Sequence, residues 1–98
     1  MLTKEQIKII TAIVDANKRV AKVWVFGSFA RNEERPDSDI DLLFSFKENQ
    51  SFGYIEYFKL QEKLEKSLQR KVELISEDSL LPFAKTSSYK DRILIYGS

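Results

Sequence analysis

Residues 27–44, GSFARNEERPDSDIDLLF, decide the fold of this chain. The stretch opens with Gly27 and Ser28, continues for ten residues, and then places Asp39 and Asp41 one residue apart before an apolar run. That run is typical of a core strand, and burying a charge in such a strand without a partner is costly. We therefore expect something positive close to these two acids.

The bulk composition indicates one ordinary globular domain, residues 1–98. Hydrophobic residues make up 43% and charged residues 32% of the 98 positions, which argues against disorder. Sixteen basic and fifteen acidic residues give a net charge of +1, so no general attraction to nucleic acid or to a membrane is expected. The basic spot at residues 69–71, Gln-Arg-Lys, is too small to indicate DNA binding.

The chain contains no cysteine and no histidine. Their absence excludes disulfides, thiolate nucleophiles, the commonest general base and the commonest zinc ligand. Any chemistry must run on carboxylates, hydroxyls, lysine and arginine, and any metal should be a hard cation. No apolar run reaches the length of a membrane span, and the first residues, MLTKEQIK, have no signal-peptide core, so we expect a cytoplasmic protein.

Hydrophobic periodicity predicts helices and strands in alternation. Thr3 and Gln6 form a capping box that begins the first helix. The expected helices cover residues 3–17 and 54–68, and the expected strands cover residues 20–26, 39–46 and 71–76. Residues 28–31 could form a single helical turn. Beyond Ser76 we expect a short helix, a break at Pro82 and a last element ending in ILIYG.

Connection lengths predict the topology. About a dozen residues join the first two strands, which favours antiparallel pairing, whereas a full helix joins the second and third, which suits a right-handed parallel crossover. The predicted fold class is α/β, a small mixed three-stranded sheet of order 1-2-3 flanked by helices. In this arrangement Gly27-Ser28, Asp39 and Asp41, and Glu73 meet at one edge of the sheet.

The two aspartates suit a divalent cation. Side chains alternate along a strand, so Asp39 and Asp41 should point the same way, with Cα atoms about 6.6 Å apart. Such a pair can hold two ions about 3.5–4 Å apart, the arrangement used for displacement at phosphorus, and Mg²⁺ is the natural candidate. Glu73 in the third strand is either a solvated acid on a sheet edge or a further ligand that accepts a proton from an attacking hydroxyl.

Gly27 and Ser28 suit a phosphate group. Glycine allows the backbone to turn sharply and to approach a ligand closely. Ser28 begins a short helical turn whose free N–H groups and hydroxyl could hold phosphate oxygens. Arg31, one turn later, could either reach the same phosphates or brace the loop before Asp39 by a bidentate bond.

Gly-Ser, ten residues and Asp-x-Asp are together the signature of the DNA polymerase β-like nucleotidyltransferase superfamily. The form GSFAR…SDIDLLF resembles its smallest branch, the minimal (MNT-type) nucleotidyltransferases, over nearly the whole chain. The resemblance implies a phosphate seat at Gly27 and Ser28 and metal-binding aspartates at Asp39 and Asp41. It places the third acid at Glu73, in VEL where the family usually has VDL.

The resemblance also implies a reaction and a partner. Members move a nucleoside monophosphate from a nucleoside triphosphate to a hydroxyl and release pyrophosphate. The chain resembles the MNT antitoxin of HEPN/MNT toxin–antitoxin pairs, and some of these antitoxins attach AMP to a tyrosine of the helical HEPN toxin. We therefore expect an adenylyltransferase that uses ATP and two Mg²⁺ ions, in a homo- or hetero-oligomer in which another chain completes the site.

Two departures from the family pattern keep other functions open. Asn32 stands where glycine is common, and Glu73 is one methylene longer than aspartate. A displacement of about 1 Å can cost about 100-fold in rate, so the first alternative is a weak or inactive, nucleotide-binding antitoxin that acts by contact alone. The second alternative is a subunit of a small-molecule transferase that modifies an aminoglycoside-like hydroxyl.

Overall fold

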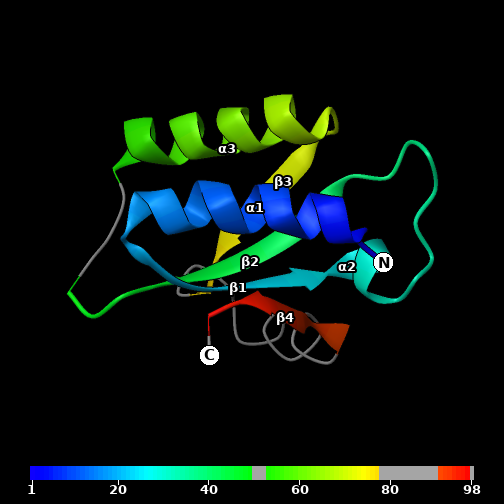
Figure 1. Ribbon diagram of the computed structural model, residues 1–98, viewed down its shortest axis with the longest axis horizontal. Helices are drawn as coiled ribbons and strands as arrows, with labels where there is room; N and C mark the ends of the chain where they lie inside the picture. The colour runs from blue at the N-terminus through cyan, green and yellow to red at the C-terminus, as the bar shows by residue number, and fades with distance from the viewer. Residues whose placement is uncertain (50–52, 78–90, 98) are drawn as a thin grey trace.

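A computed structural model describes residues 1–49, 53–77 and 91–97. Three helices and four strands follow one another along these residues (Figure 1). Their order is α1 (Lys4–Asn17), β1 (Val20–Phe26), α2 (Gly27–Ala30), β2 (Ile40–Phe46), α3 (Tyr54–Leu68), β3 (Val72–Ser76) and β4 (Ile93–Tyr96). The predicted helices and strands are confirmed to within a residue at each boundary, while the short helix and the break at Pro82 lie outside the described residues.

The strands form one mixed sheet in the order β3-β2-β1-β4. β1 and β2 are antiparallel and β2 and β3 are parallel, as the two connection lengths predict. The expectation of three strands is wrong by one, because β4 adds antiparallel to the other side of β1. β4 has only four residues, and a run that short carries no signal of where it pairs.

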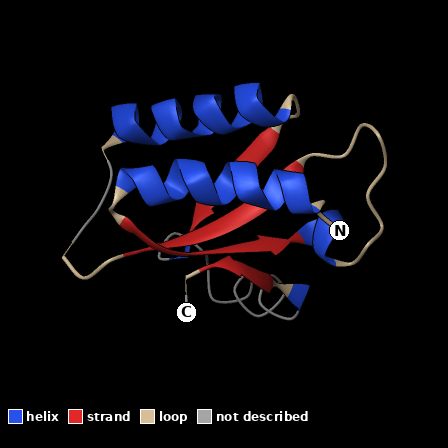
Figure 2. Ribbon diagram, in the orientation of Figure 1, coloured by secondary structure: helices blue, strands red, loops and turns tan. Residues whose placement is uncertain are grey.

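Both long helices cover one face of the sheet (Figure 2). The predicted capping box begins α1, with the Thr3 hydroxyl accepting from the Gln6 N–H at 3.1 Å and the Gln6 side chain accepting from the Thr3 N–H at 2.8 Å. Ile10 and Val14 of α1 and Leu60 and Leu64 of α3 are buried against the sheet. No helix among the described residues is long and apolar enough to cross a bilayer.

Alternation along β2 separates the core from the acids. Ile40 and Leu42 are fully buried in the core beneath the helices. Asp41 lies between them, and since successive side chains point to opposite faces of a sheet, its carboxyl lies on the face away from α1 and α3. The packing of Ile40 and Leu42 in the core therefore determines the face of the sheet on which the Asp41 side chain lies.

Candidate functional site

Three adjacent strands bring the predicted site residues together. Asp41 of β2 pairs in register with Phe26 of β1 on one side and with Glu73 of β3 on the other. Gly27 follows Phe26 directly and begins α2. The juxtaposition of Gly27, Asp41 and Glu73 at one sheet edge, predicted from connection lengths alone, is present in the structure.

Gly27 lies against the carboxyl group of Asp41. Its φ is +71°, in the left-handed region that favours glycine. A Cβ at this position would lie 2.3 Å from Oδ2 of Asp41 and 3.2 Å from its Cγ. The absence of a side chain therefore gives the Asp41 carboxyl its place beside the turn into α2.

The amino end of α2 is open. Phe26 precedes the helix in extended conformation, and the helix start has no side-chain capping hydrogen bond from this residue. Ser28, the second residue of the helix, is half-buried, and its carbonyl accepts from the Glu33 N–H at 2.8 Å. Free N–H groups at a helix start attract anions. The predicted phosphate seat is thus compatible with the local backbone.

The surroundings of Asp41 disfavour the charged form of its carboxyl group. Its pKa is raised from 3.8 to about 7, first because burial disfavours the charged carboxylate. A hydrogen bond with Glu73 and the negative charges of Glu73 and Asp39 act in the same direction, while Arg31 opposes them. The raised pKa of Asp41 means that this carboxyl keeps its proton up to near-neutral pH, and a bound cation would favour its charged form.

Two neighbouring carboxylates at this site can supply the protein ligands of a hard divalent cation. Among the described residues, no three acidic side chains converge closely enough to form a complete metal site. Asp39 is exposed just before β2 begins, whereas Asp41 is half-buried and meets Glu73. Mg²⁺ usually takes one or two carboxylates and completes its shell with water and substrate phosphate oxygens. Asp41 and a neighbouring acid meet that requirement.

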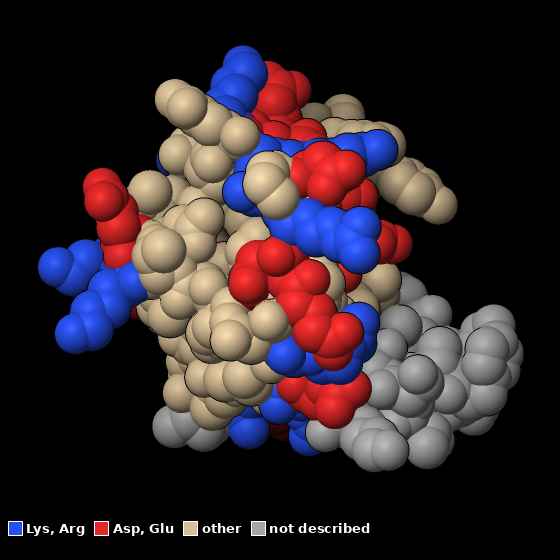
Figure 3. Space-filling model, turned by 90° about the vertical axis from the view of Figure 1, so that its right-hand side faces the viewer, with Lys and Arg blue, Asp and Glu red and all other residues tan. Residues whose placement is uncertain are grey.

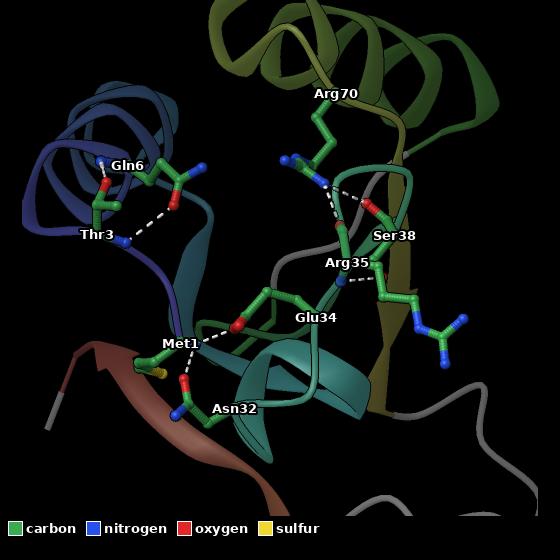
Figure 4. A network of polar contacts seen from close by, with 8 residues as sticks. All are labelled: Met1, Thr3, Gln6, Asn32, Glu34, Arg35, Ser38 and Arg70. Atoms are coloured by element: carbon green, nitrogen blue, oxygen red, sulfur yellow. Dashed lines mark hydrogen bonds and ion pairs between the residues drawn. The ribbon is translucent and has the colours of Figure 1, made fainter.

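Arg31 lies close enough to influence Asp41, but its partners are other acids. Its Nε is 3.2 Å from Oε1 of Glu33, and its Nη1 is 3.8 Å from Oδ2 of Asp91. Arg31 therefore touches the loop before Asp39 at Glu33, through one Nε contact and not through a bidentate bond. A second arginine, Arg70, contacts the same loop through its Nη1 (Figure 4). Sequence reasoning missed Arg70 because its partners are backbone carbonyls, which leave no pattern of side chains.

The other end of this loop is held near α2. The amino group of Met1 donates to Oδ1 of Asn32 at 2.8 Å and pairs with Glu34 (Figure 4). Asn32 has a φ of +59°, which explains why it can stand where the family commonly has glycine. Asparagine tolerates the left-handed region better than other residues with a Cβ, except aspartate.

Asn32→Val should therefore destabilise the chain by about 1–2 kcal/mol, because a β-branched residue is strained at positive φ. Asn32→Gly is the matched control and should stay within about 1 kcal/mol of the wild type, since glycine adopts this conformation without strain. Urea denaturation followed by circular dichroism measures both. Equal midpoints for the valine variant and the wild type would show that residue 32 is not held in the left-handed conformation.

Charges of both signs surround the site. Figure 3 shows acidic and basic side chains interleaved on the side of the molecule that carries α2 and the loop to β2. This distribution agrees with the net charge of +1. A continuous basic surface, the usual footprint of a nucleic-acid interface, is not visible on this face.

The chain resembles known proteins throughout its length. A family model described as "Nucleotidyltransferase domain" matches residues 7–95. A candidate protein adenylyltransferase of Methanocaldococcus jannaschii is 38% identical over 93 residues, which cover 94% of this chain and 93% of the relative. The protein adenylyltransferase MntA of Thermococcus cleftensis is 37% identical over 87 residues, covering 82% of this chain and 83% of the relative.

Solved structures share the fold. One is a toxin–antitoxin complex with AMP-PNP, with a TM-score of 0.77 and 19% identity over 99% of this chain and 75% of the matched chain. Another is a tri-AMPylated HEPN toxin of Shewanella oneidensis in complex with an MNT antitoxin, with a TM-score of 0.78 and 17% identity over 99% of this chain and 74% of the matched chain. Together with the sequence matches, these likenesses show that the chain belongs to the nucleotidyltransferase domain family, among homologues of the protein adenylyltransferase MntA.

Proposed function

We propose that this chain transfers AMP from ATP to a hydroxyl group of a partner protein, a tyrosine of a HEPN-type toxin, and thereby acts as an antitoxin. The observation that carries the proposal is the pairing of Asp41 and Glu73 on adjacent strands, beside the side-chain-free turn at Gly27. The named activity of the MntA relative and the AMPylated toxin in a structural neighbour support the choice of nucleotide and acceptor.

In this reaction, one group of residues binds the phosphates and another binds the metal ions. The N–H groups that begin α2, with the Ser28 hydroxyl, hold the phosphates that leave as pyrophosphate. Asp39 and Asp41 would hold two Mg²⁺ ions, which would neutralise the charge of the triphosphate. The acceptor oxygen attacks the α-phosphorus, a P–O bond to the acceptor forms, and the P–O bond to the pyrophosphate breaks.

Glu73 takes two roles in this proposal. It is the register partner of Asp41 on the adjacent strand, so it can act as the third ligand. It also accepts the proton that the acceptor hydroxyl loses during attack. Arg31, whose positive charge acts on Asp41, contributes positive charge toward the phosphates.

The partner completes the site. Asp39 and Glu73 are exposed and Asp41 is only half-buried, so a nucleotide bound beside them would stay open to solvent without a second chain. Excluding water protects the reaction from hydrolysis and strengthens electrostatic interactions. A helical toxin docked over this edge would supply both the cover and the acceptor tyrosine.

A direct test mixes the chain with its HEPN-type partner, ATP and Mg²⁺, and weighs the partner by intact mass spectrometry. We expect the partner to gain the mass of AMP, with tandem spectra locating it on tyrosine. The analogue with a methylene group between the α- and β-phosphorus atoms is the control, because the bond that must break is replaced by P–C. A partner of unchanged mass with ATP, under conditions where the two proteins bind, would defeat the proposal.

One observation favours a second candidate, inhibition by contact alone. No three acids of the described residues form a complete metal site, and Glu73 differs from the usual aspartate. In that case the chain would neutralise its partner without ATP. Inhibition of the partner measured with and without ATP, at saturating concentrations of the chain, separates the two functions.

A further inference from the structure

Arg70 joins α3 to the loop that precedes the acids. It lies in the turn after α3, two residues before β3 begins. Its Nη1 donates to the backbone carbonyls of Arg35 at 3.2 Å and Ser38 at 2.8 Å (Figure 4). It also donates to the Pro36 carbonyl at 3.1 Å. Ser38 is the residue before Asp39. A single guanidinium nitrogen therefore lies at the centre of the turn that leads into the first acid.

The same side chain also contacts α2. The guanidinium carbon of Arg70 lies 5.2 Å from the centre of the Phe29 ring, within the range of a cation–π contact. Phe29 follows Ser28 in α2 and is only 3% exposed, so it anchors this short helix in the core. Arg70 thus lies between the proposed phosphate seat and the loop that carries the acids.

The backbone at Arg70 is itself fixed. Its N–H donates to the carbonyl of Glu65 at 3.3 Å, and the Glu65 carboxylate accepts from the Val72 N–H at 3.0 Å. One residue after Arg70, the Lys71 carbonyl accepts from the N–H of Ile40 at 2.9 Å. The arginine therefore projects from a point whose position relative to the start of β2 and β3 is determined by hydrogen bonds.

The turn before Asp39 closes by its own hydrogen bonds, and Arg70 attaches it to the segment after α3. Inside the loop, the Ser38 hydroxyl accepts from the Arg35 N–H at 2.8 Å, and the Ser38 N–H donates to the Arg35 carbonyl at 3.0 Å. These bonds close the turn locally but do not fix it relative to the rest of the molecule. The carbonyls of Pro36 and Ser38 point toward Arg70, and that contact supplies the attachment.

We propose that Arg70 is a positioning residue, which holds Asp39 and the start of β2 in the place required relative to Gly27 and Ser28. The inference rests on the proposed function, because position matters only if the acids and the phosphate seat act on one nucleotide. Arg70 touches neither nucleotide nor metal in this role and acts through backbone carbonyls and through Phe29. Misplacement of catalytic groups by about 1 Å can cost about 100-fold in rate.

The test compares Arg70→Met with Arg19→Met. Methionine keeps an unbranched apolar stem but cannot donate to the carbonyls. Arg19 pairs with Glu56 at the beginning of α3, away from the site, so its replacement removes an arginine and its ion pair without changing the loop contacts described above. Arg70→Lys keeps the charge and the donors but not the planar group over Phe29, and it should give intermediate values.

Two readouts need no turnover. Amide hydrogen exchange at Ser38, followed by nuclear magnetic resonance, should be at least about 10-fold faster in Arg70→Met, because the turn loses its attachment. Binding of Mn²⁺ in the presence of ATP, followed by electron paramagnetic resonance, should weaken by about 10-fold or more, since ligand positions determine metal affinity. Arg19→Met should match the wild type in both.

The third readout is the rate of AMP transfer to the partner at saturating acceptor. We expect kcat to fall by about 10- to 100-fold in Arg70→Met, with a smaller change in the KM for the acceptor. Faster exchange at Ser38 with unchanged metal binding and unchanged kcat would overturn the positioning role. Exchange at Ser38 equal to that of the wild type would overturn it as well.

The two proposals fail separately. If the wild-type chain transfers no AMP, the proposed function fails, while hydrogen exchange and Mn²⁺ binding still decide whether Arg70 positions the loop. If the wild type transfers AMP and Arg70→Met transfers it equally fast, only the positioning role fails. Unfolding of Arg70→Met would be seen in the exchange of α1 amides, and Arg70→Lys would then serve for all three readouts.

Discussion

The double variant Asp39→Asn, Asp41→Asn should lose AMP transfer by about 1,000-fold or more and yet be more stable than the wild type. Asparagine keeps the size of aspartate but cannot neutralise a divalent cation, so the charge of the triphosphate would remain uncompensated during transfer. Initial rates of labelling of the partner with radioactive ATP measure the loss. Thermal unfolding in metal-free buffer measures the gain in stability.

The gain in stability has a definite pH dependence. The pKa of Asp41 in the folded chain, about 7, lies above its ordinary value of 3.8. The stabilising effect of protonated Asp41 is complete below its ordinary pKa and is lost as the pH rises through about 7. Replacing it by asparagine removes that loss, so the variant should exceed the wild type by about 1–2 kcal/mol at pH 8, after discounting for solvent screening of a half-exposed group. The difference should shrink at pH 5.

Asp37→Asn is the matched control. Asp37 is exposed in the same loop, two residues before Asp39, and no role at the nucleotide is proposed for it. Its replacement removes one acid from the loop without changing the pair at Asp41 and Glu73, so transfer should stay near the wild-type rate. Equal losses in the control and the double variant would contradict the assignment of the acids. Full protection against the toxin by the double variant would favour inhibition by contact alone.

The meeting of Gly27, Asp41 and Glu73 at one end of the strands could be predicted, because it depends on connection lengths and on the alternation of side chains along a strand. The short link before β2 and the helix before β3 determine which strand ends meet, and the apolar residues around Asp41 determine its face. The different surroundings of the two aspartates could not be predicted in this way. Asp39 lies before the first residue of β2, so strict alternation does not extend to it, and only Asp41 acquires a register partner in Glu73.

Features that depend on tertiary contacts were out of reach of sequence patterns. The pairing of β4 joins a four-residue strand to β1 across a long sequence separation. The role of Arg70 depends on carbonyl groups of residues more than 30 positions away in the chain. In the sequence Arg70 is only the middle residue of a weak basic spot, and every exposed arginine offers the same donors. The resemblance to the family pointed to the acids, but not to the side chain that holds their loop.

Gly27→Ala should lower AMP transfer by more than about 100-fold with a much smaller effect on folding. An alanine Cβ would lie 2.3 Å from Oδ2 of Asp41, so the carboxyl must swing away. The contact is with the free end of a side chain, which can rotate, so the main cost to stability is the positive φ of +71°, about 1–2 kcal/mol. The moved carboxyl, however, is the proposed metal ligand, and displacement by about 1 Å or more has a large effect on rate.

Gly53→Ala provides the comparison that isolates this effect. Gly53 precedes α3 with a φ of −79°, and a Cβ there would meet nothing within 4 Å. Its replacement should leave the rate of AMP transfer unchanged, and urea denaturation should place both variants within about 2 kcal/mol of the wild type. A Gly27→Ala chain that transfers AMP at the wild-type rate would mean that the Asp41 carboxyl does not act from the place it occupies beside the turn. The acids and the proposed phosphate-binding turn meet at the contact between Gly27 and Asp41. Such a result would therefore mean that they do not act together on one bound nucleotide.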